Sequence, residues 1–350
     1  MNESIILGIE SSCDDTSAAV IRGNKILSNI AANQEIHREY GGVVPELASR
    51  AHQQNMIPVV EKAVNKANIQ QKDISAIGFT RGPGLLGSLL VGTSFAKSLA
   101  MSLNVPLIEV NHLQAHILAH FIEDANIMPP KFPFLCLTVS GGHTMIVLVK
   151  DYFDMEIIGK TTDDAAGEAF DKIGKVFGLD YPAGPIVDRL AKKGNENLFK
   201  FNKPRLENYD YSFSGVKTSV LYFIQKELKN NPDFIKENID DLCASVQKTI
   251  VEILMEKLEK AAKDLDIKDI AIAGGVSANS GLREAMKKNE EKLGWNIYIP
   301  KFEYTTDNAA MIAMVAQLKL QRGEFADLSV SATARYELES QVTEDGSPKI

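Results

Sequence analysis

The feature that most constrains the fold is a sequence plan that occurs twice along the chain. Residues 5–21 and residues 134–150 each contain an apolar run, a short polar turn and a second apolar run, which is the pattern of a β-hairpin. Each half then contains an apolar strand, a glycine-rich loop and a helix, at residues 74–99 and from residue 267 onward. Strands that alternate with helices are typical of α/β proteins. The repeated plan therefore predicts two related α/β domains with a cleft between them.

A proline-rich stretch at residues 128–133 interrupts regular structure between the two halves, and 350 residues are enough for two domains. The sequence predicts an N-terminal domain over residues 1–125 and a C-terminal domain over residues 126–336. Within the second domain, residues 185–265 are predicted to form a helix-rich insertion. The polar tail, residues 337–350, is predicted to be disordered.

The glycine-rich loops, residues 80–84 and residues 274–281, allow two interpretations. Backbone N–H groups in such a loop, together with the positive end of the following helix, favour an anion such as phosphate. Glycines also occur simply where a chain must turn tightly. The presence of one loop in each half favours a ligand held between the halves.

Composition and charge limit the classes of function. The net charge of −8 and the pI of about 5.4 make the chain as a whole a poor general binder of nucleic acid. The longest purely apolar runs are strand-sized, and the N-terminus lacks the features of a secretory signal, which argues against a membrane anchor or secretion. The cysteines, Cys13, Cys136 and Cys243, are widely spaced and odd in number, which argues against a disulfide framework. We therefore expect a cytoplasmic protein.

Two histidines, His112 and His116, follow a strand-like stretch and stand one helical turn apart. Because residues i and i+4 share a helix face, both imidazoles can converge on one metal ion. Two buried, hydrogen-bonded core histidines are the alternative. Zinc proteases of the H-E-x-x-H type carry a glutamate after the first histidine, and Leu113 stands there in this chain. Asp307 could supply a further ligand, or it could be the N-cap of the helix that follows it.

Two further clusters carry charge. The acidic segment at residues 161–171 could cap a helix or hold polar groups of a ligand. Between Arg189 and Arg205 six basic residues stand against one acid, a local balance of 6 − 1 = +5, with Phe199 and Phe201 interleaved. This stretch is the strongest candidate for a nucleic-acid-binding patch, and a solvated surface is the alternative. Its basic residues are Arg189, Lys192, Lys193, Lys200, Lys203 and Arg205.

Long motifs occur in order over nearly the whole chain. They are LGIESSCDDTS at 7–17, HREYGGVVPELASRAH at 37–52, TRGPGLLGSLLVG at 80–92, NHLQAHILAH at 111–120, LTVSGGHT at 137–144, DDAAGEAFDKIGK at 163–175, YPAGPIVDRLA at 181–191, YSFSGVKT at 211–218, GGVSANSGLR at 274–283 and YTTDNAAMIA at 304–313. Together they resemble the universal tRNA threonylcarbamoyladenosine biosynthesis family. Its members transfer a threonylcarbamoyl group to adenosine 37 of tRNAs that read ANN codons.

The resemblance implies an actin/hexokinase/Hsp70-type fold with the active site in the interdomain cleft. It also implies one divalent metal ion, iron(II) or alternatively zinc, held by His112, His116 and Asp307. The donor would be threonylcarbamoyl-AMP, with AMP as the leaving group. Asp14 matches an acid that the family needs for activity. The residues implied to bind the adenylate are Thr138, Val139, Ser140, Gly141, Gly142, Asp171, Gly184, Asp188 and Asn279.

The resemblance, which looks bacterial, also implies partners. These are the tRNA anticodon loop, a shorter paralogue of the same fold and a small P-loop ATPase, with no membrane association.

Other classes of function are compatible with parts of the pattern. The fold alone would allow an actin-fold ATPase or sugar kinase, but such enzymes use magnesium and need no paired-histidine site. A metal-dependent glycoprotein endopeptidase is disfavoured by Leu113 in place of a catalytic acid. A non-catalytic scaffold would have no need for the set of metal ligands.

Overall fold

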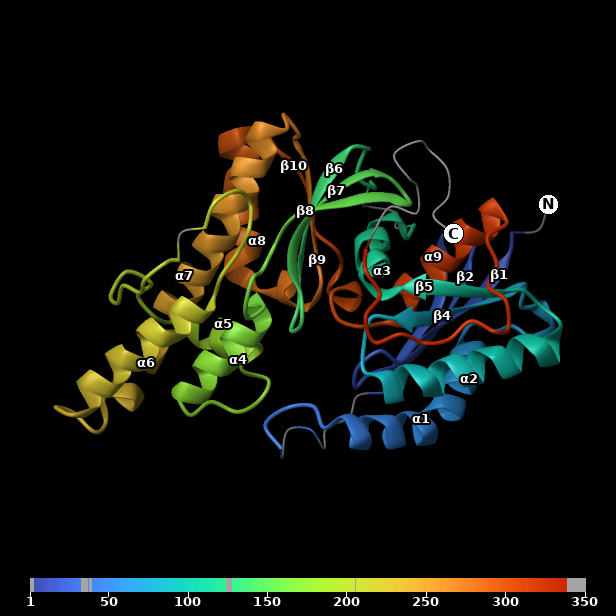
Figure 1. Ribbon diagram of the computed structural model, residues 1–350, viewed down its shortest axis with the longest axis horizontal. Helices are drawn as coiled ribbons and strands as arrows, with labels where there is room; N and C mark the ends of the chain where they lie inside the picture. Colours follow the sequence, from blue (N-terminus) through green and yellow to red (C-terminus); the bar gives the residue numbers. More distant parts are fainter. Residues whose placement is uncertain (1–2, 33–36, 38–39, 124–127, 205, 339–350) are drawn as a thin grey trace. The chain divides into compact units, whose positions relative to one another are not determined.

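The computed structural model describes every residue except 1–2, 33–36, 38–39, 124–127, 205 and 339–350 (Figure 1). The chain forms two compact units, each with one five-stranded sheet. The first unit comprises Met1–Pro130 together with Pro300–Ser340, and the second is built on Lys131–Ile299. Helices accompany both sheets, so the α/β class predicted from the repeated plan is confirmed.

The sheet of the first unit has the strand order β3–β2–β1–β4–β5. β1 lies antiparallel to β2 and parallel to β4, so the hairpin predicted at residues 5–21 is present. All six residues of β1 are buried, as expected for a central strand covered on both faces. The strands are β1 Ile5–Glu10, β2 Thr16–Arg22, β3 Lys25–Ala32, β4 Ala76–Gly82 and β5 Leu107–Asn111.

Helices cover both faces of this first sheet. α1 and α2 pack against each other on one face, where Leu7 and Ile9 join an apolar cluster, and α9 packs on β1, β2 and β4 on the other face (Figure 1). The strand and helix predicted at residues 74–99 are present as β4 and α2. The helices of this unit are α1 Pro45–Lys66, η2 Gln71–Asp73, α2 Leu86–Leu103, α3 His112–Leu118, η3 Ala119–Phe121, η5 Phe302–Tyr304 and α9 Ala309–Arg322.

The contact between α9 and the sheet depends on small residues. A Cβ atom at Gly8 would lie 2.6 Å from the carbonyl oxygen of Ala309, and one at Gly78 would lie 2.5 Å from the Cβ of Ala316. Only glycine permits the backbone to come this close. The start of α9, with Asp307 just before it, is therefore held beside β1.

The helix α2 is the one helix in the described part of the chain whose length and composition would allow it to cross a membrane. It packs against α1 and β4, and Lys97 lies within it. We assign it to the first α/β unit on this basis.

The second unit repeats the plan of the first. Its sheet has the order β10–β9–β6–β7–β8, with β6 antiparallel to β7 and parallel to β9. The hairpin predicted at residues 134–150 therefore takes the place that β1 and β2 take in the other sheet. The strands are β6 Phe134–Val139, β7 Thr144–Asp151, β8 Asp154–Lys160, β9 Asp269–Ala273 and β10 Asn296–Tyr298.

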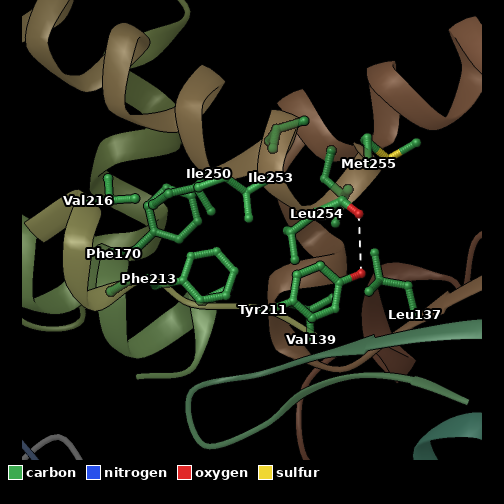
Figure 2. Packing of buried hydrophobic residues seen from close by; sticks show 14 of the residues in the cluster. Leu137, Val139, Phe170, Tyr211, Phe213, Val216, Ile250, Ile253, Leu254 and Met255 are labelled. Carbon is green, nitrogen blue, oxygen red and sulfur yellow. Dashed lines mark hydrogen bonds between the residues drawn. The ribbon is translucent and has the colours of Figure 1, made fainter. Parts of the chain in front are cut away.

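The helices of the second unit surround an apolar core. The predicted stripe on the longest helix, including Val246, Ile250 and Leu254, is buried in it. Figure 2 shows Tyr211 inside this core, where its hydroxyl donates to the carbonyl oxygen of Leu254 at 3.2 Å. The helix-rich segment begins at Ala166, earlier than predicted. The helices are α4 Ala166–Val176, α5 Ala183–Ala191, α6 Ser214–Leu228, α7 Phe234–Asp264, η4 Gly275–Ala278 and α8 Ser280–Leu293.

Two predicted boundaries differ from the structure. The second domain does not continue to residue 336, because the chain returns to the first unit at Pro300 and α9 packs on the first sheet. The predicted disordered tail begins too early, since Leu338 is buried and the carbonyl oxygen of Glu337 accepts a hydrogen bond from Asn111 Nδ2. The rest of that tail, residues 339–350, lies outside the described residues.

Candidate metal centre and substrate-binding loops

The ends of three elements of the first unit converge at the candidate metal centre. β5 ends at Asn111, whose side chain caps α3 by accepting hydrogen bonds from the N–H groups of Leu113 and Gln114. α3 therefore begins at His112 and carries both histidines, which stand one helical turn apart. Asp307 lies just before α9, which the glycine contacts hold beside β1.

The three predicted ligands lie within contact distance of one another. His116 Nε2 is 3.2 Å from His112 Nε2 and 3.2 Å from Asp307 Oδ1. His112 Nε2 is 3.4 Å from the same carboxylate oxygen. Both imidazoles are buried, and Asp307 is partly exposed. Residues that are far apart in sequence thus form a compact N, N, O donor set.

These separations fit a bound divalent cation. Tetrahedral bonds of about 2.0–2.1 Å, usual for zinc with nitrogen and oxygen ligands, place neighbouring ligand atoms about 3.4 Å apart. Two imidazoles and one carboxylate also form a donor set that suits zinc and iron(II). The Asp307 side chain is 28% exposed, so the donor set is not completely enclosed. The metal-binding role of His112, His116 and Asp307 remains a prediction.

Charge is concentrated around His112. Burial by itself would lower the pKa of His112, but the carboxylates of Asp307 and Glu10 outweigh it and raise this pKa well above its usual value. Burial would raise the pKa of Asp307, and the adjacent imidazoles instead lower it well below its usual value. Asp307 and Glu10 therefore both favour positive charge at this site.

The alternative role of Asp307 as a helix cap is not observed. Asn308 is the N-cap of α9, since its side chain accepts a hydrogen bond from the N–H of Met311 at 3.1 Å. Asp307 directs its carboxylate to the histidines. His120, further along the same row of histidines, is buried in η3 and is not part of the three-ligand cluster.

Glu10, the last residue of β1, is a site residue that the sequence did not reveal. Its carboxylate is fully buried, and its Oε2 lies 3.0 Å from His112 Nδ1 and accepts a hydrogen bond from Thr80 Oγ1 at 2.7 Å. Neighbouring charge on His112 lowers the pKa of Glu10 although burial, the largest single influence, acts in the opposite direction. Its position at the carboxyl end of a central strand was the available sequence signal.

Asp14 lies in the turn between β1 and β2, in the same unit as the histidines. His52 of α1 binds both the middle of this turn and the start of β2. Its Nε2–H donates to the carbonyl oxygen of Cys13 at 3.0 Å, and its Nδ1 accepts from the hydroxyl of Thr16 at 2.8 Å. Burial, reinforced by the charge of Asp14, raises the pKa of Asp15 to about 7. A catalytic role for Asp14 remains a prediction.

The five predicted residues around the β6–β7 turn differ in what they offer. Thr138 and Val139 are buried, and Val139 belongs to the apolar core shown in Figure 2. The hydroxyl of Ser140 accepts from the N–H of Gly142 at 3.3 Å, which closes the turn. A Cβ at Gly141 or Gly142 would meet no atom within 4 Å. The two exposed glycines therefore present open backbone to a ligand.

Asp171 of α4 and Gly184 of α5 meet directly. The Asp171 carboxylate accepts hydrogen bonds from the N–H groups of Ala183 at 2.7 Å and Gly184 at 3.3 Å. Burial raises the pKa of Asp171, although these two hydrogen bonds oppose the shift. In the structure Asp171 thus satisfies the first N–H groups of α5.

Asp188 and Asn279 come together at the start of α8. The carboxylate of Asp188 accepts from the backbone N–H of Ser280 at 2.9 Å and from its hydroxyl at 2.6 Å. Asn279 is the N-cap of α8, and its amide donates to Gln247 Oε1 at 2.7 Å. The predicted adenylate residues therefore gather into two groups at helix starts, with a third at the β6–β7 turn.

In the glycine-rich loops some glycines are required for a tight turn or a close contact, and others leave the backbone open for a ligand. Gly274 has a φ of +84°, and a Cβ there would lie 2.5 Å from the carbonyl oxygen of Val139, so this position requires glycine for the turn itself. A Cβ at Gly84 would overlap the carbonyl oxygen of Ser12. Gly275, by contrast, has no atom near its Cβ position and offers open backbone.

In the predicted nucleic-acid patch the basic side chains are exposed, whereas the two aromatic side chains pack on the core of the second unit. Phe201 is buried, and Phe199 packs against Phe223 with ring centroids 5.3 Å apart. Phe201 belongs to the core of the second unit and cannot stack on a base, and Phe199 is half-buried against that core. Lys192 pairs with Asp188 at 3.3 Å. The exposed basic residues are Arg189, Lys192, Lys193, Lys200 and Lys203, and Arg205 lies outside the described residues.

Comparisons with known structures identify the fold. Full-length HypF in its phosphate- and nucleotide-bound form superimposes with a TM-score of 0.60 at 13% identity, covering 93% of this chain and 48% of HypF. An activator of the 2-hydroxyisocaproyl-CoA dehydratase from Clostridium difficile superimposes with a TM-score of 0.50 at 14% identity, covering 93% of this chain and 99% of that one. The fold is the actin/hexokinase type.

Comparisons of sequence identify the family. A profile of the family described as tRNA N6-adenosine threonylcarbamoyltransferase matches residues 25–314. A protein of that description from Riemerella anatipestifer is 83% identical over 97% of this chain and 99% of its own length. Another, from Christiangramia forsetii, is 62% identical over 95% of this chain and 97% of its own length. The chain therefore belongs to the tRNA N6-adenosine threonylcarbamoyltransferase family.

Proposed function

We propose that this chain transfers the threonylcarbamoyl group of threonylcarbamoyl-AMP to N6 of adenosine 37 in tRNAs that read ANN codons. The observation that carries the proposal is the convergence of His112, His116 and Asp307 at metal-ligand spacing in a member of this family. In the reaction, N6 forms a bond to the carbamoyl carbon and loses a proton. The bond from that carbon to the phosphate oxygen breaks, and AMP leaves with the electron pair.

The proposed metal centre takes one divalent ion, iron(II) or zinc. When bound, such an ion acts as a Lewis acid that stabilises developing negative charge on carbamoyl or phosphate oxygens. His112 and His116 supply neutral nitrogen donors and Asp307 supplies the single anionic oxygen. A set with one negative charge leaves the complex net positive. The adenylate is an anion, so this charge favours its binding.

The second unit supplies the groups proposed to hold the adenylate. The open backbone at Gly141 and Gly275 can donate N–H groups to phosphate or carboxylate oxygens, whereas the N–H of Gly142 already donates to Ser140 Oγ. Asp188 and Asn279 position the start of α8 by accepting hydrogen bonds from the N–H groups of Ser280 and Leu282. Their proposed contribution is to orient the donor, through backbone more than through charged side chains.

The tRNA is proposed to contact the exposed basic residues between Arg189 and Lys203. Positive side chains on one stretch of surface attract the phosphate backbone even when the whole chain is acidic. N6 of an unstacked anticodon-loop base is reached more easily than N6 in a duplex. Since Phe201 is buried and Phe199 is half-buried against the core, the contact is expected to be mainly electrostatic.

The proposed protein partners are a shorter paralogue of the same fold and a small P-loop ATPase. Support for a protein-binding surface comes from apolar side chains on α1 and α2 that the described part of the chain leaves exposed. Ile57, Leu86, Leu90 and Met101 are each about half exposed or more. We propose a cytoplasmic location, in keeping with a tRNA substrate and three unpaired cysteines.

Reconstitution tests the proposed activity. The purified chain is incubated with tRNA, threonine, bicarbonate, ATP and the partner proteins, and the digested tRNA is examined for threonylcarbamoyladenosine. We expect the modified nucleoside with the wild-type chain and its loss with His116→Ala. Failure of the wild-type chain to form it from chemically prepared threonylcarbamoyl-AMP would overturn the proposal.

A further inference from the structure

Glu10 is a buried acid with an unusual set of partners. Its side chain has no exposed surface, and the hydrogen bonds that reach it come from Ser12 N–H, the hydroxyl of Thr80 and the His112 ring. Among the described residues, no lysine or arginine pairs with it. A buried carboxylate is costly unless it is paired with positive charge. Within the part of the chain that the structure describes, His112 is the neighbour of Glu10 that can carry a positive charge.

The contact with Glu10 determines which nitrogen of His112 carries the proton. Nδ1 lies 3.0 Å from Glu10 Oε2, a carboxylate oxygen that only accepts hydrogen bonds, and 3.2 Å from Ser12 Oγ, a hydroxyl that can accept as well as donate. Nδ1 must therefore carry the hydrogen. In the neutral ring the lone pair is then on Nε2, the atom that faces His116 Nε2 and Asp307 Oδ1.

His116 provides an internal contrast. Its Nε2 also faces the donor set, but its Nδ1 is buried without a hydrogen-bond partner in the described structure. The two proposed ligands therefore differ in the contacts of their Nδ1 atoms, which face away from the donor set. Only His112 has a carboxylate that fixes its tautomer and ring orientation.

We propose that Glu10 is a positioning residue of the metal centre, which holds His112 by accepting a hydrogen bond from its Nδ1–H and so directs the Nε2 lone pair to the metal ion. This inference rests on the proposed metal centre. A carboxylate behind a ligating histidine orients the ring and raises its basicity, and loss of such a partner costs about 10–100-fold in metal affinity. Glu10 does not touch the substrate in this proposal.

Metal affinity of Glu10→Gln tests the inference. The amide keeps the size of the side chain but can present an N–H to Nδ1, which would favour the wrong tautomer of His112. We expect the affinity for Zn(II) or Co(II), measured by competition with a chelator, to fall about 10–100-fold. The d–d absorption of bound Co(II) should change with it. Circular dichroism and thermal melting establish the folded fraction in each sample.

Thr80→Val is the matched control. It removes the other side-chain donor to the same carboxylate oxygen but leaves the contact with His112 in place. We expect its metal affinity to stay within about threefold of wild type, well below the loss expected for a missing carboxylate partner. An equal loss in both variants would overturn the inference, because it would assign Glu10 a purely structural role. Wild-type affinity in Glu10→Gln would overturn it as well.

A measurement on the wild-type chain does not depend on the folding of a variant. Nitrogen-15 NMR of the histidine rings in the Zn(II)-loaded protein should show His112 with a protonated Nδ1 and a metal-bound Nε2. The reverse assignment would contradict the inference and leave the metal centre intact. A wild-type chain that binds neither Zn(II) nor Co(II) would overturn the proposed metal centre and this inference together.

Discussion

From the sequence, Asp307 could be either a metal ligand or the N-cap of α9, and in the structure it is not the cap. Asn308 caps α9, so the Asp307 carboxylate is available to the two imidazoles. An aspartate and an asparagine cap a helix about equally well. A metal ion distinguishes them, because only the carboxylate brings negative charge.

Asp307→Asn is expected to lose metal and tRNA modification while thermal stability changes little. The neutral amide weakens the attraction for a divalent cation and leaves His112 and His116 as the remaining donors. Elemental analysis, melting temperature and the nucleoside assay measure the three properties. A variant that retains both metal and activity would remove Asp307 from the proposed ligand set.

The sequence was more informative about some site residues than about others. The spacing of His112 and His116 predicts a shared face, because both belong to one short helix. Glu10 could not be linked to His112 from local pattern, since about a hundred residues separate them and only the sheet brings them together. Asp171 and Asn279 were predicted from resemblance, which does not show that their side chains also satisfy the ends of helices.

The elements were predictable where their signal is local. Both hairpins combine strand-like runs with a short polar turn, and both were found at the predicted positions. The membership of α9 in the first unit was not predictable, because it depends on glycine and alanine residues that are far apart in sequence. The burial of Phe201 was not predictable for a related reason, since nothing local shows which way an aromatic ring points.

Gly8→Ala is expected to disturb the contact between β1 and α9. The added Cβ would overlap backbone atoms of Ala309 and Ala313, which cannot move without shifting the helix. We expect a loss of about 1–3 kcal/mol in the free energy of unfolding, typical of an overpacked core, together with weaker metal binding through displacement of Asp307. Denaturant unfolding and chelator competition measure the two effects. Gly141→Ala, where the Cβ meets no atom, should leave stability unchanged.

Asn111 links the start of α3 to the C-terminal segment. Its side-chain oxygen caps the helix, and its Nδ2 donates to the carbonyl oxygens of Tyr336 and Glu337, each at 3.2 Å. Asn111→Asp should keep the cap but lose both donated hydrogen bonds and place an anion against two carbonyl groups. We expect faster hydrogen exchange in residues 331–338 with α3 still helical. Unchanged exchange there would show that Asn111 does not hold this segment.

At the scale of the whole molecule, a net charge of −8 coexists with a local basic stretch. Charge reversal at Lys192, Lys193 and Lys200 is expected to weaken tRNA binding and to reduce its salt dependence by about one unit of slope for each phosphate that is no longer neutralised. The control reverses three other exposed lysines, at the end of α6 and the start of α7, and so makes the same change in total charge: Lys226, Lys229 and Lys236. Equal effects of the two sets would place the tRNA on another surface.

The return of the chain to the first unit at Pro300 has a consequence for how the protein is made. A ribosome delivers the chain from the N-terminus, so Lys131–Ile299 emerges completely before α9 does. The whole of Lys131–Ile299 is therefore available for folding while the first sheet still lacks α9, one of its covering helices. Asp307 is also the last of the three proposed ligands to leave the exit tunnel. A chain released early by a stalled ribosome would therefore carry both histidines without their acidic partner, and such fragments should be recognisable as unable to retain metal.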